Sequence, residues 1–110
     1  MDLEVYWTHF AESRLEDIFS YYRIKAGLNI ARKLTKGIVD KTIDLQKNPR
    51  KGQKETLLKE YEEDFRHLVF KNYKIIYFIN TKKGRIDIVN VFDCRQNPTK
   101  MKIVVDNSNG

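Results

Sequence analysis

Three basic residues carry the clearest chemical potential in this chain: Arg66, Lys74 and Arg95. Each lies in or directly after a segment rich in β-branched and aromatic residues, the composition typical of strands. If these strands are neighbours, we expect the three side chains to converge on one patch. There they would hold a phosphate and stabilise the charge of its transition state. Taken alone, each of these residues also fits an ordinary solvated position on a strand. The site is therefore predicted only if all three side chains lie together.

Aromatic residues beside these bases offer a second kind of contact. Tyr73, Tyr77 and Phe78 would stack on nucleobases if their rings were exposed. Aromatic side chains in strands are more often buried, so core packing is the favoured interpretation. His67 has the chemistry to transfer a proton, but strand alternation places it on the face opposite Arg66.

Metal and cysteine chemistry find little support in the sequence. The chain has one cysteine, Cys94, which cannot form an internal disulfide or a multi-cysteine metal site. The two histidines, His9 and His67, lack a ligand spacing. Cys94 beside Arg95 fits a small apolar residue at a strand end better than a nucleophile. We therefore expect no metal and no cofactor.

Length and composition favour one globular domain. The chain has 110 residues, of which 41% are hydrophobic and 12% aromatic, which is enough for a single core. We expect the domain to span residues 1–106, with a frayed tail at 107–110. No segment approaches the roughly 20 apolar residues of a bilayer span, and the first residues are acidic where a secretory signal would be basic. These features predict a cytoplasmic protein with no membrane partner.

The net charge of +6 is unevenly distributed along the chain. Residues 1–22 hold five acids and one base, whereas residues 23–60 hold eleven bases and four acids. Such asymmetry suits a polyanionic partner, either nucleic acid or an acidic protein segment. The same lysines would also simply keep a small protein soluble.

Apolar spacing then predicts the elements that must position these residues. Helical periodicity indicates two helices, over about 8–23 and 27–47, joined as an antiparallel hairpin. Alternation predicts strands at Leu3–Trp7, with Leu3, Val5 and Trp7 on one face, and at Phe65–Phe70, Tyr73–Ile79 and Ile86–Phe92, with a further short strand possible at Lys102–Val105.

This order predicts an α+β fold of two layers: an N-terminal strand, an antiparallel helix hairpin, and then an antiparallel three-stranded meander. The helices would cover one face of the sheet. We expect the other face to meet solvent or a partner, so that basic side chains emerging there would be held in place by the strands.

The chain also resembles the RelE/ParE toxin superfamily, to which plasmid stabilisation proteins belong. The resemblance covers residues 3 to about 101 and is carried by Phe65, Arg66, Asn72–Tyr77 and Val91–Pro98, with support from Val5–Thr8, Asn48, Pro49 and Gly52. It implies a RelE/ParE-like fold and the toxin of a type II toxin–antitoxin module. The implied partner is a cognate antitoxin, which covers the toxin in a hetero-oligomer.

Two activities share this superfamily, and the resemblance implies different residues for each. In the branch that cleaves mRNA on the ribosome, Arg66, Lys74 and Arg95 would bind the phosphate. The tyrosine that completes the acid–base chemistry would fall at Met101, and methionine cannot transfer a proton. The branch that inhibits DNA gyrase has no such requirement. We therefore favour a toxin that inhibits growth through its basic sheet surface by acting on gyrase, with ribosome-dependent mRNA cleavage and a non-toxic binding module for acidic peptide or RNA as alternatives.

Overall fold

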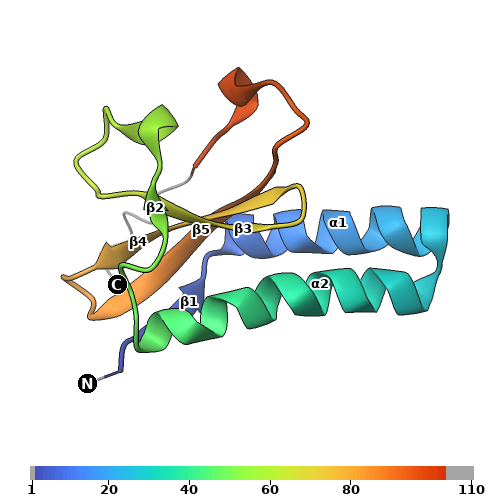
Figure 1. The fold of residues 1–110 in the computed structure, drawn as a ribbon, viewed down its shortest axis with the longest axis horizontal. Coiled ribbons are helices and arrows are strands. Elements are labelled where there is room, and N and C mark those ends of the chain that lie inside the picture. Colours follow the sequence, from blue (N-terminus) through green and yellow to red (C-terminus); the bar gives the residue numbers. More distant parts are fainter. Residues whose placement is uncertain (1, 104–110) are drawn as a thin grey trace.

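The computed structural model describes residues 2–103 as two layers, a five-stranded sheet and a pair of helices (Figure 1). The strands have the order β1-β5-β4-β3-β2; β1 runs parallel to β5 and every other neighbouring pair is antiparallel. The elements are β1 (Glu4–Trp7), α1 (His9–Ala26), α2 (Leu28–Ile43), β2 (Gln53–Lys54), β3 (Arg66–Phe70), β4 (Tyr73–Asn80) and β5 (Arg85–Asp93), with 3-10 turns η1 (Asp44–Gln46), η2 (Thr56–Leu58) and η3 (Pro98–Lys100).

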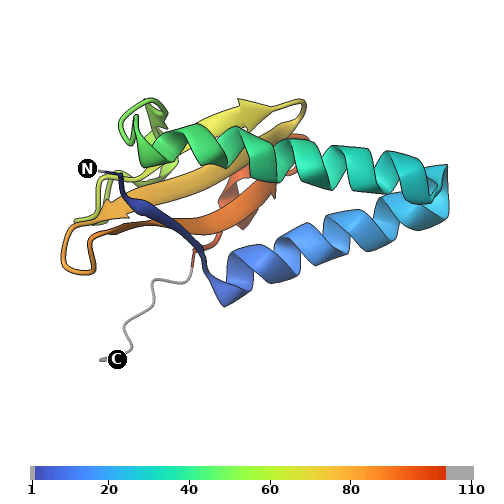
Figure 2. The ribbon, with the colours of Figure 1, turned by 90° about the horizontal axis from the view of Figure 1, so that it is seen from below.

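The helix hairpin has a defined start and a very short turn. Thr8 caps α1, because its Oγ1 accepts a hydrogen bond from the Ala11 amide, and it also donates to the Ile88 carbonyl of β5. Gly27 ends α1 and begins α2, with a φ of 101° that side-chain-bearing residues rarely adopt. The two helices are therefore joined through a single residue (Figure 2).

The main core lies between the helices and the sheet. α1 and α2 contribute apolar residues at helical spacing, and Tyr73, Ile75 and Tyr77 of β4 meet them from the sheet. Leu3, Val5 and Trp7 pack against the same cluster, as the sequence predicted for the first strand. Tyr77 and Ile75 are fully buried, so β4 is a central strand in packing as well as in order.

A second core covers the opposite face, and here our expectation of a face open to solvent or a partner was wrong. Its members are Leu58, Phe65, Ile76, Phe78, Val89 and Phe92, against which Met101 and Ile103 pack. The physical reason is that β4 and β5 are apolar on both faces, so both faces must be covered. The segment between β2 and β3 and the segment after η3 supply that cover.

Most element predictions are confirmed within two or three residues, and α2 ends at Ile43 before continuing as η1. The parallel β1–β5 pairing and the two-residue β2 were not predicted. Residues 102 and 103 are not in a strand, and residues 104–105 of the expected last strand lie outside the described residues, as does the tail at 107–110.

Candidate functional site

Arg66 lies on the helix-covered face of the sheet, where contacts within the chain hold it. β3 pairs Arg66 with Tyr77 of β4, and Tyr77 belongs to the main core. The Arg66 guanidinium forms an ion pair with Asp64 (Nη2 to Oδ2, 3.1 Å) and donates to the Gly52 carbonyl at 2.9 Å. Arg66 therefore fastens β3 to the loop that precedes β2.

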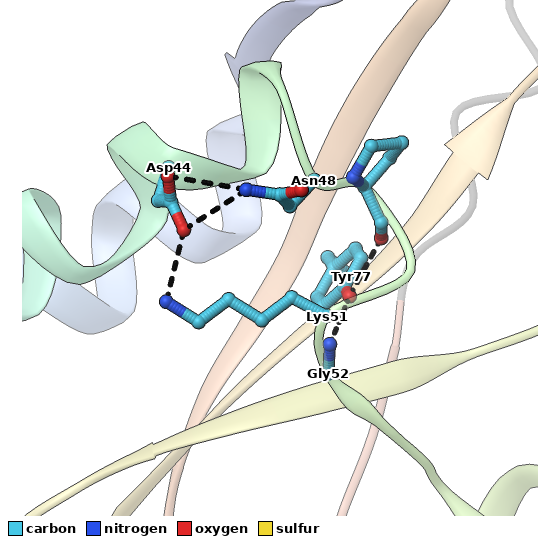
Figure 3. Close-up of polar contacts among 6 residues, drawn as sticks. Asp44, Asn48, Lys51, Gly52 and Tyr77 are labelled. Atoms are coloured by element: carbon cyan, nitrogen blue, oxygen red, sulfur yellow. Dashed lines mark hydrogen bonds and ion pairs between the residues drawn. The ribbon is translucent and has the colours of Figure 1, made fainter.

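The loop that receives Arg66 is itself fixed by Tyr77 (Figure 3). The buried Tyr77 hydroxyl donates to the Pro49 carbonyl at 2.8 Å and accepts from the Gly52 amide at 2.9 Å. Burial raises the pKa of Tyr77, so the hydroxyl keeps its proton for this contact. On the outer side, Lys51 Nζ lies 2.9 Å from an Asp44 carboxylate oxygen and lowers the pKa of Asp44.

Lys74 lies on the opposite face, in contact with a buried acid. Its Nζ is 2.9 Å from Glu55 Oε1, and His67 Nδ1 is 3.0 Å from the same oxygen. The Glu55 side chain is only 1% exposed, and its other oxygen accepts from the Leu57 amide. Burial lowers the pKa of His67 below its ordinary value, with Lys74 adding to the effect and Glu55 opposing it. His67 is therefore on the face opposite Arg66, as predicted.

Arg95 lies beyond the end of β5 and is the most accessible of the three. Its guanidinium donates two hydrogen bonds to the Asp93 carboxylate, from Nη2 to Oδ2 at 2.8 Å and from Nε to Oδ1 at 3.0 Å. The Arg95 side chain is nevertheless 61% exposed. The hydrogen bonds from Arg95 hold the pKa of Asp93 at about 2. Around them lies a cleft between α1 and the sheet, whose lining includes Arg14, Tyr21, Tyr22 and Tyr73. Burial, with help from Tyr22, raises the pKa of Tyr73 to about 12.

The predicted convergence of Arg66, Lys74 and Arg95 is therefore wrong. β3 pairs Val69 with Lys74 and Arg66 with Tyr77, and since Val69 and Arg66 are three residues apart, they point to opposite faces. Arg95 lies two residues after Asp93, which is opposite Tyr73 on β4. Arg66 is opposite Tyr77, and Tyr73 and Tyr77 are four residues apart, a separation of about 13 Å along a strand. Each cation has its own carboxylate, and whether any of them contacts a target stays a prediction.

The aromatic residues have the structural role that was favoured. Tyr73, Tyr77 and Phe78 are all buried, the first two in the main core and Phe78 in the second. Met101 is half-buried against the second core, on the face away from Arg66. Glu55 was missed altogether, because one buried acid cannot be told by residue type from the exposed Glu60 and Glu62 that follow it.

Two further features bear on the chemistry available to residues 2–103. No three of their His, Cys, Asp and Glu side chains are grouped so that they could hold a metal ion. Over the same residues, neither helix is long and apolar enough to cross a membrane.

The fold and the distribution of charge thus define a small α+β protein with a long helix hairpin, in which Arg66, Lys74 and Arg95 lie at three separate places. A sequence model of the ParE toxin of the type II toxin-antitoxin system parDE matches residues 5–98. Since this match covers most of the chain, the protein belongs to the ParE toxin family.

A solved structure has the same fold: the chromosomal ParDE TA system from P. aeruginosa, with a TM-score of 0.69 and 20% sequence identity. The similarity covers 83% of this chain and 95% of that chain. Comparison with curated protein sequences found no match.

Proposed function

We propose that this toxin arrests growth by binding DNA gyrase, not by cutting mRNA, and that a cognate antitoxin protein neutralises it in a hetero-oligomer. The observation that carries this proposal is the separation of the three bases expected in a nuclease site. Arg66, Lys74 and Arg95 are neutralised by Asp64, Glu55 and Asp93 respectively, at three different places.

The absence of a proton donor among the carried-over positions supports the same proposal. Met101 falls where the ribosome-dependent branch needs a tyrosine, and it packs against the second core. His67 is directed toward Glu55, on the other face from Arg66. A phosphodiester cleavage without a general acid or base would lose roughly 10² to 10⁴ in rate.

Arg95 remains a candidate contact to the target. Its side chain is mostly exposed, whereas Arg66 and Lys74 are largely covered by the contacts that hold them. We expect Arg95→Ala to weaken growth arrest and gyrase inhibition about fivefold to tenfold, the loss of one exposed charged contact of about 1 kcal/mol. Lys82→Ala, in the exposed turn between β4 and β5, is the matched control and should change neither.

The test of the proposal expresses the chain with and without an antitoxin gene and measures two activities of the toxin. Growth arrest without the antitoxin, inhibition of supercoiling by purified gyrase, and no new RNA 5′ ends inside translated codons are the expected results. Codon-positioned cleavage with supercoiling untouched would instead favour the ribosome-dependent nuclease. Unaffected growth would favour a non-toxic binding module for acidic peptide or RNA.

A further inference from the structure

We propose that the hairpin tip, residues 21–33 at the end of α1 and the start of α2, is the surface that docks onto the toxin's target. The partner it fits is an acidic protein surface with an apolar pocket that receives Ile24. This inference rests on the proposed function for the identity of the target, gyrase, and deepens it by naming the contact surface.

The first observation is the concentration of exposed apolar side chains at the tip. Of the eight large apolar side chains exposed among residues 2–103, four belong to residues 21–33: Ile24 (81%), Leu28 (41%), Ile30 (53%) and Tyr21 (54%), which also lines the cleft around Arg95. The remaining four are scattered over α2, η2, the segment that follows η2, and β3. Single exposed apolar residues are ordinary, but a group of them at one projecting end is typical of an interaction site.

The second observation is the charge around these apolar side chains. Residues 21–33 contain four bases, Arg23, Lys25, Arg32 and Lys33, and no acid lies between Asp17 and Asp40. Within residues 2–103 none of these four cations forms an ion pair; Lys25 Nζ lies 5.9 Å from the ring centroid of Tyr21. Unpaired cations around apolar anchors are complementary to carboxylates around an apolar pocket.

The third observation is that the turn at the tip is hydrogen-bonded and that the tip projects. The Gly27 amide lies 3.1 Å from the Tyr22 carbonyl and 3.2 Å from that of Arg23, and its own carbonyl accepts from Ala31, so the turn is hydrogen-bonded on both sides. Both views show the hairpin extending past the strands at the end where Gly27 lies (Figures 1 and 2). A preformed surface spares the entropy of ordering a loop on binding.

These features favour a protein partner over nucleic acid. Phosphates would engage the four cations but would leave Ile24 and Ile30 in water, whereas a protein pocket buries them as anchors. They also favour the tip over the sheet as the target surface. Both sheet faces are covered by apolar cores, and Arg66 and Lys74 are largely covered and already paired.

The experiment compares an apolar variant and a charge variant of the tip with matched controls outside it. The apolar pair is Ile24→Gln against Ile43→Gln, since Ile43 is 54% exposed at the other end of the hairpin. The charge variant carries both Arg32→Ala and Lys33→Ala. Its control carries Lys82→Ala and Lys83→Ala, which replace two exposed lysines in the β4–β5 turn. Each protein is assayed for growth arrest, affinity for purified gyrase, antitoxin binding, thermal unfolding and mass in solution.

We expect both tip variants to lose gyrase affinity about tenfold or more and to relieve growth arrest. The charge variant should also weaken the salt dependence of binding. The controls should behave as the unmodified chain, and all variants should still unfold cooperatively and bind the antitoxin.

Several results would overturn the inference. Tip variants that keep growth arrest but lose the antitoxin would assign the tip to the antitoxin. Loss of growth arrest in the charge variant alone, with the apolar variant unaffected, would point to nucleic acid as the partner. A change in the mass of a tip variant in solution would point to a second copy of this chain as the partner. If the unmodified chain arrests growth without any effect on gyrase, only the identity of the target is wrong. The tip is then tested by whether its variants relieve growth arrest. A chain that neither arrests growth nor binds gyrase overturns both proposals.

Discussion

The sheet and the hairpin tip use the same cationic side chains for opposite purposes. On the sheet, Arg66 and Lys74 each lie within 3.1 Å of a carboxylate that belongs to the same chain. At the tip, Arg32 and Lys33 have no such partner among residues 2–103. The difference is that a cation next to a core must be neutralised, because burying an unpaired charge costs several kcal/mol, whereas a cation on a projecting helix stays solvated.

This difference separates the charges that hold the fold from those available to a partner. Glu55 ties the segment between β2 and β3 to both Lys74 and His67, and Arg66 ties β3 to the loop at Gly52. Removing a sheet contact should therefore cost stability. Changing a tip residue should alter binding while leaving the fold in place.

The largest expected effect follows from replacing Glu55, which lies at the centre of the buried contacts. Glu55→Ala removes the carboxylate oxygen that lies 2.9 Å from the Lys74 ammonium and 3.0 Å from the His67 ring, and it leaves the Leu57 amide without its acceptor. We expect a loss of about 3 kcal/mol in the free energy of unfolding, since half of a buried ion pair is removed. Urea denaturation measures it, with Glu60→Ala, an exposed acid of the same segment, as the control. Equal stability of the two variants would mean that the contact with Glu55 contributes nothing to the fold.

A smaller effect is expected at Tyr77, which supports the loop that anchors Arg66. Tyr77→Phe removes two hydrogen bonds, to the Pro49 carbonyl and from the Gly52 amide, while keeping the ring in the core. At about 1 kcal/mol each, the loss should be about 2 kcal/mol. Tyr61→Phe, whose ring is partly exposed, should cost under about 0.5 kcal/mol.

Hydrogen exchange of the Gly52 amide gives a more local measurement of the same contact. It should accelerate in Tyr77→Phe and stay unchanged in Tyr61→Phe. Protection that persists in Tyr77→Phe would show that the hydroxyl does not hold this loop.

Local pattern was enough to predict the hairpin and the meander, because Leu34, Ile38 and the strand residues have clear periods. It was not enough for β2, where Gln53 and Lys54 are only two polar residues, or for the parallel pairing of β1 with β5 across about 80 residues. These pairings depend on contacts between distant segments.

The site was predicted less well than the fold, for a reason visible in β3 and β4. Strand membership of Arg66 and Lys74 was correct, but convergence depends on register, and a shift by one residue exchanges the two faces. The partner Glu55 lies in an irregular segment whose sequence has no period that predicts burial. The tip was overlooked since its bases were counted only as part of a broad basic stretch.

The smallest expected effect is a gain in the free energy of unfolding from one substitution in the tip, at Asn29. α2 begins with no acid in its first turn and no side-chain cap, and Asn29 is exposed there. Asn29→Asp should raise the free energy of unfolding by about 0.5 kcal/mol, because a negative charge is favourable at a helix N-terminus. The gain should shrink in high salt and disappear below about pH 3.9, where an aspartate becomes protonated.

The same Asn29→Asp variant should bind gyrase more weakly, because it adds a negative charge to a surface that is otherwise free of acids. Asn29→Gln keeps the amide and the neutral charge, so it should change neither property by much. A protein that becomes more stable yet less toxic would distinguish a binding surface from a structural one, since damage to the fold moves both quantities in the same direction. Unchanged gyrase affinity in Asn29→Asp, with its stability raised as expected, would argue that the tip does not face an acidic partner.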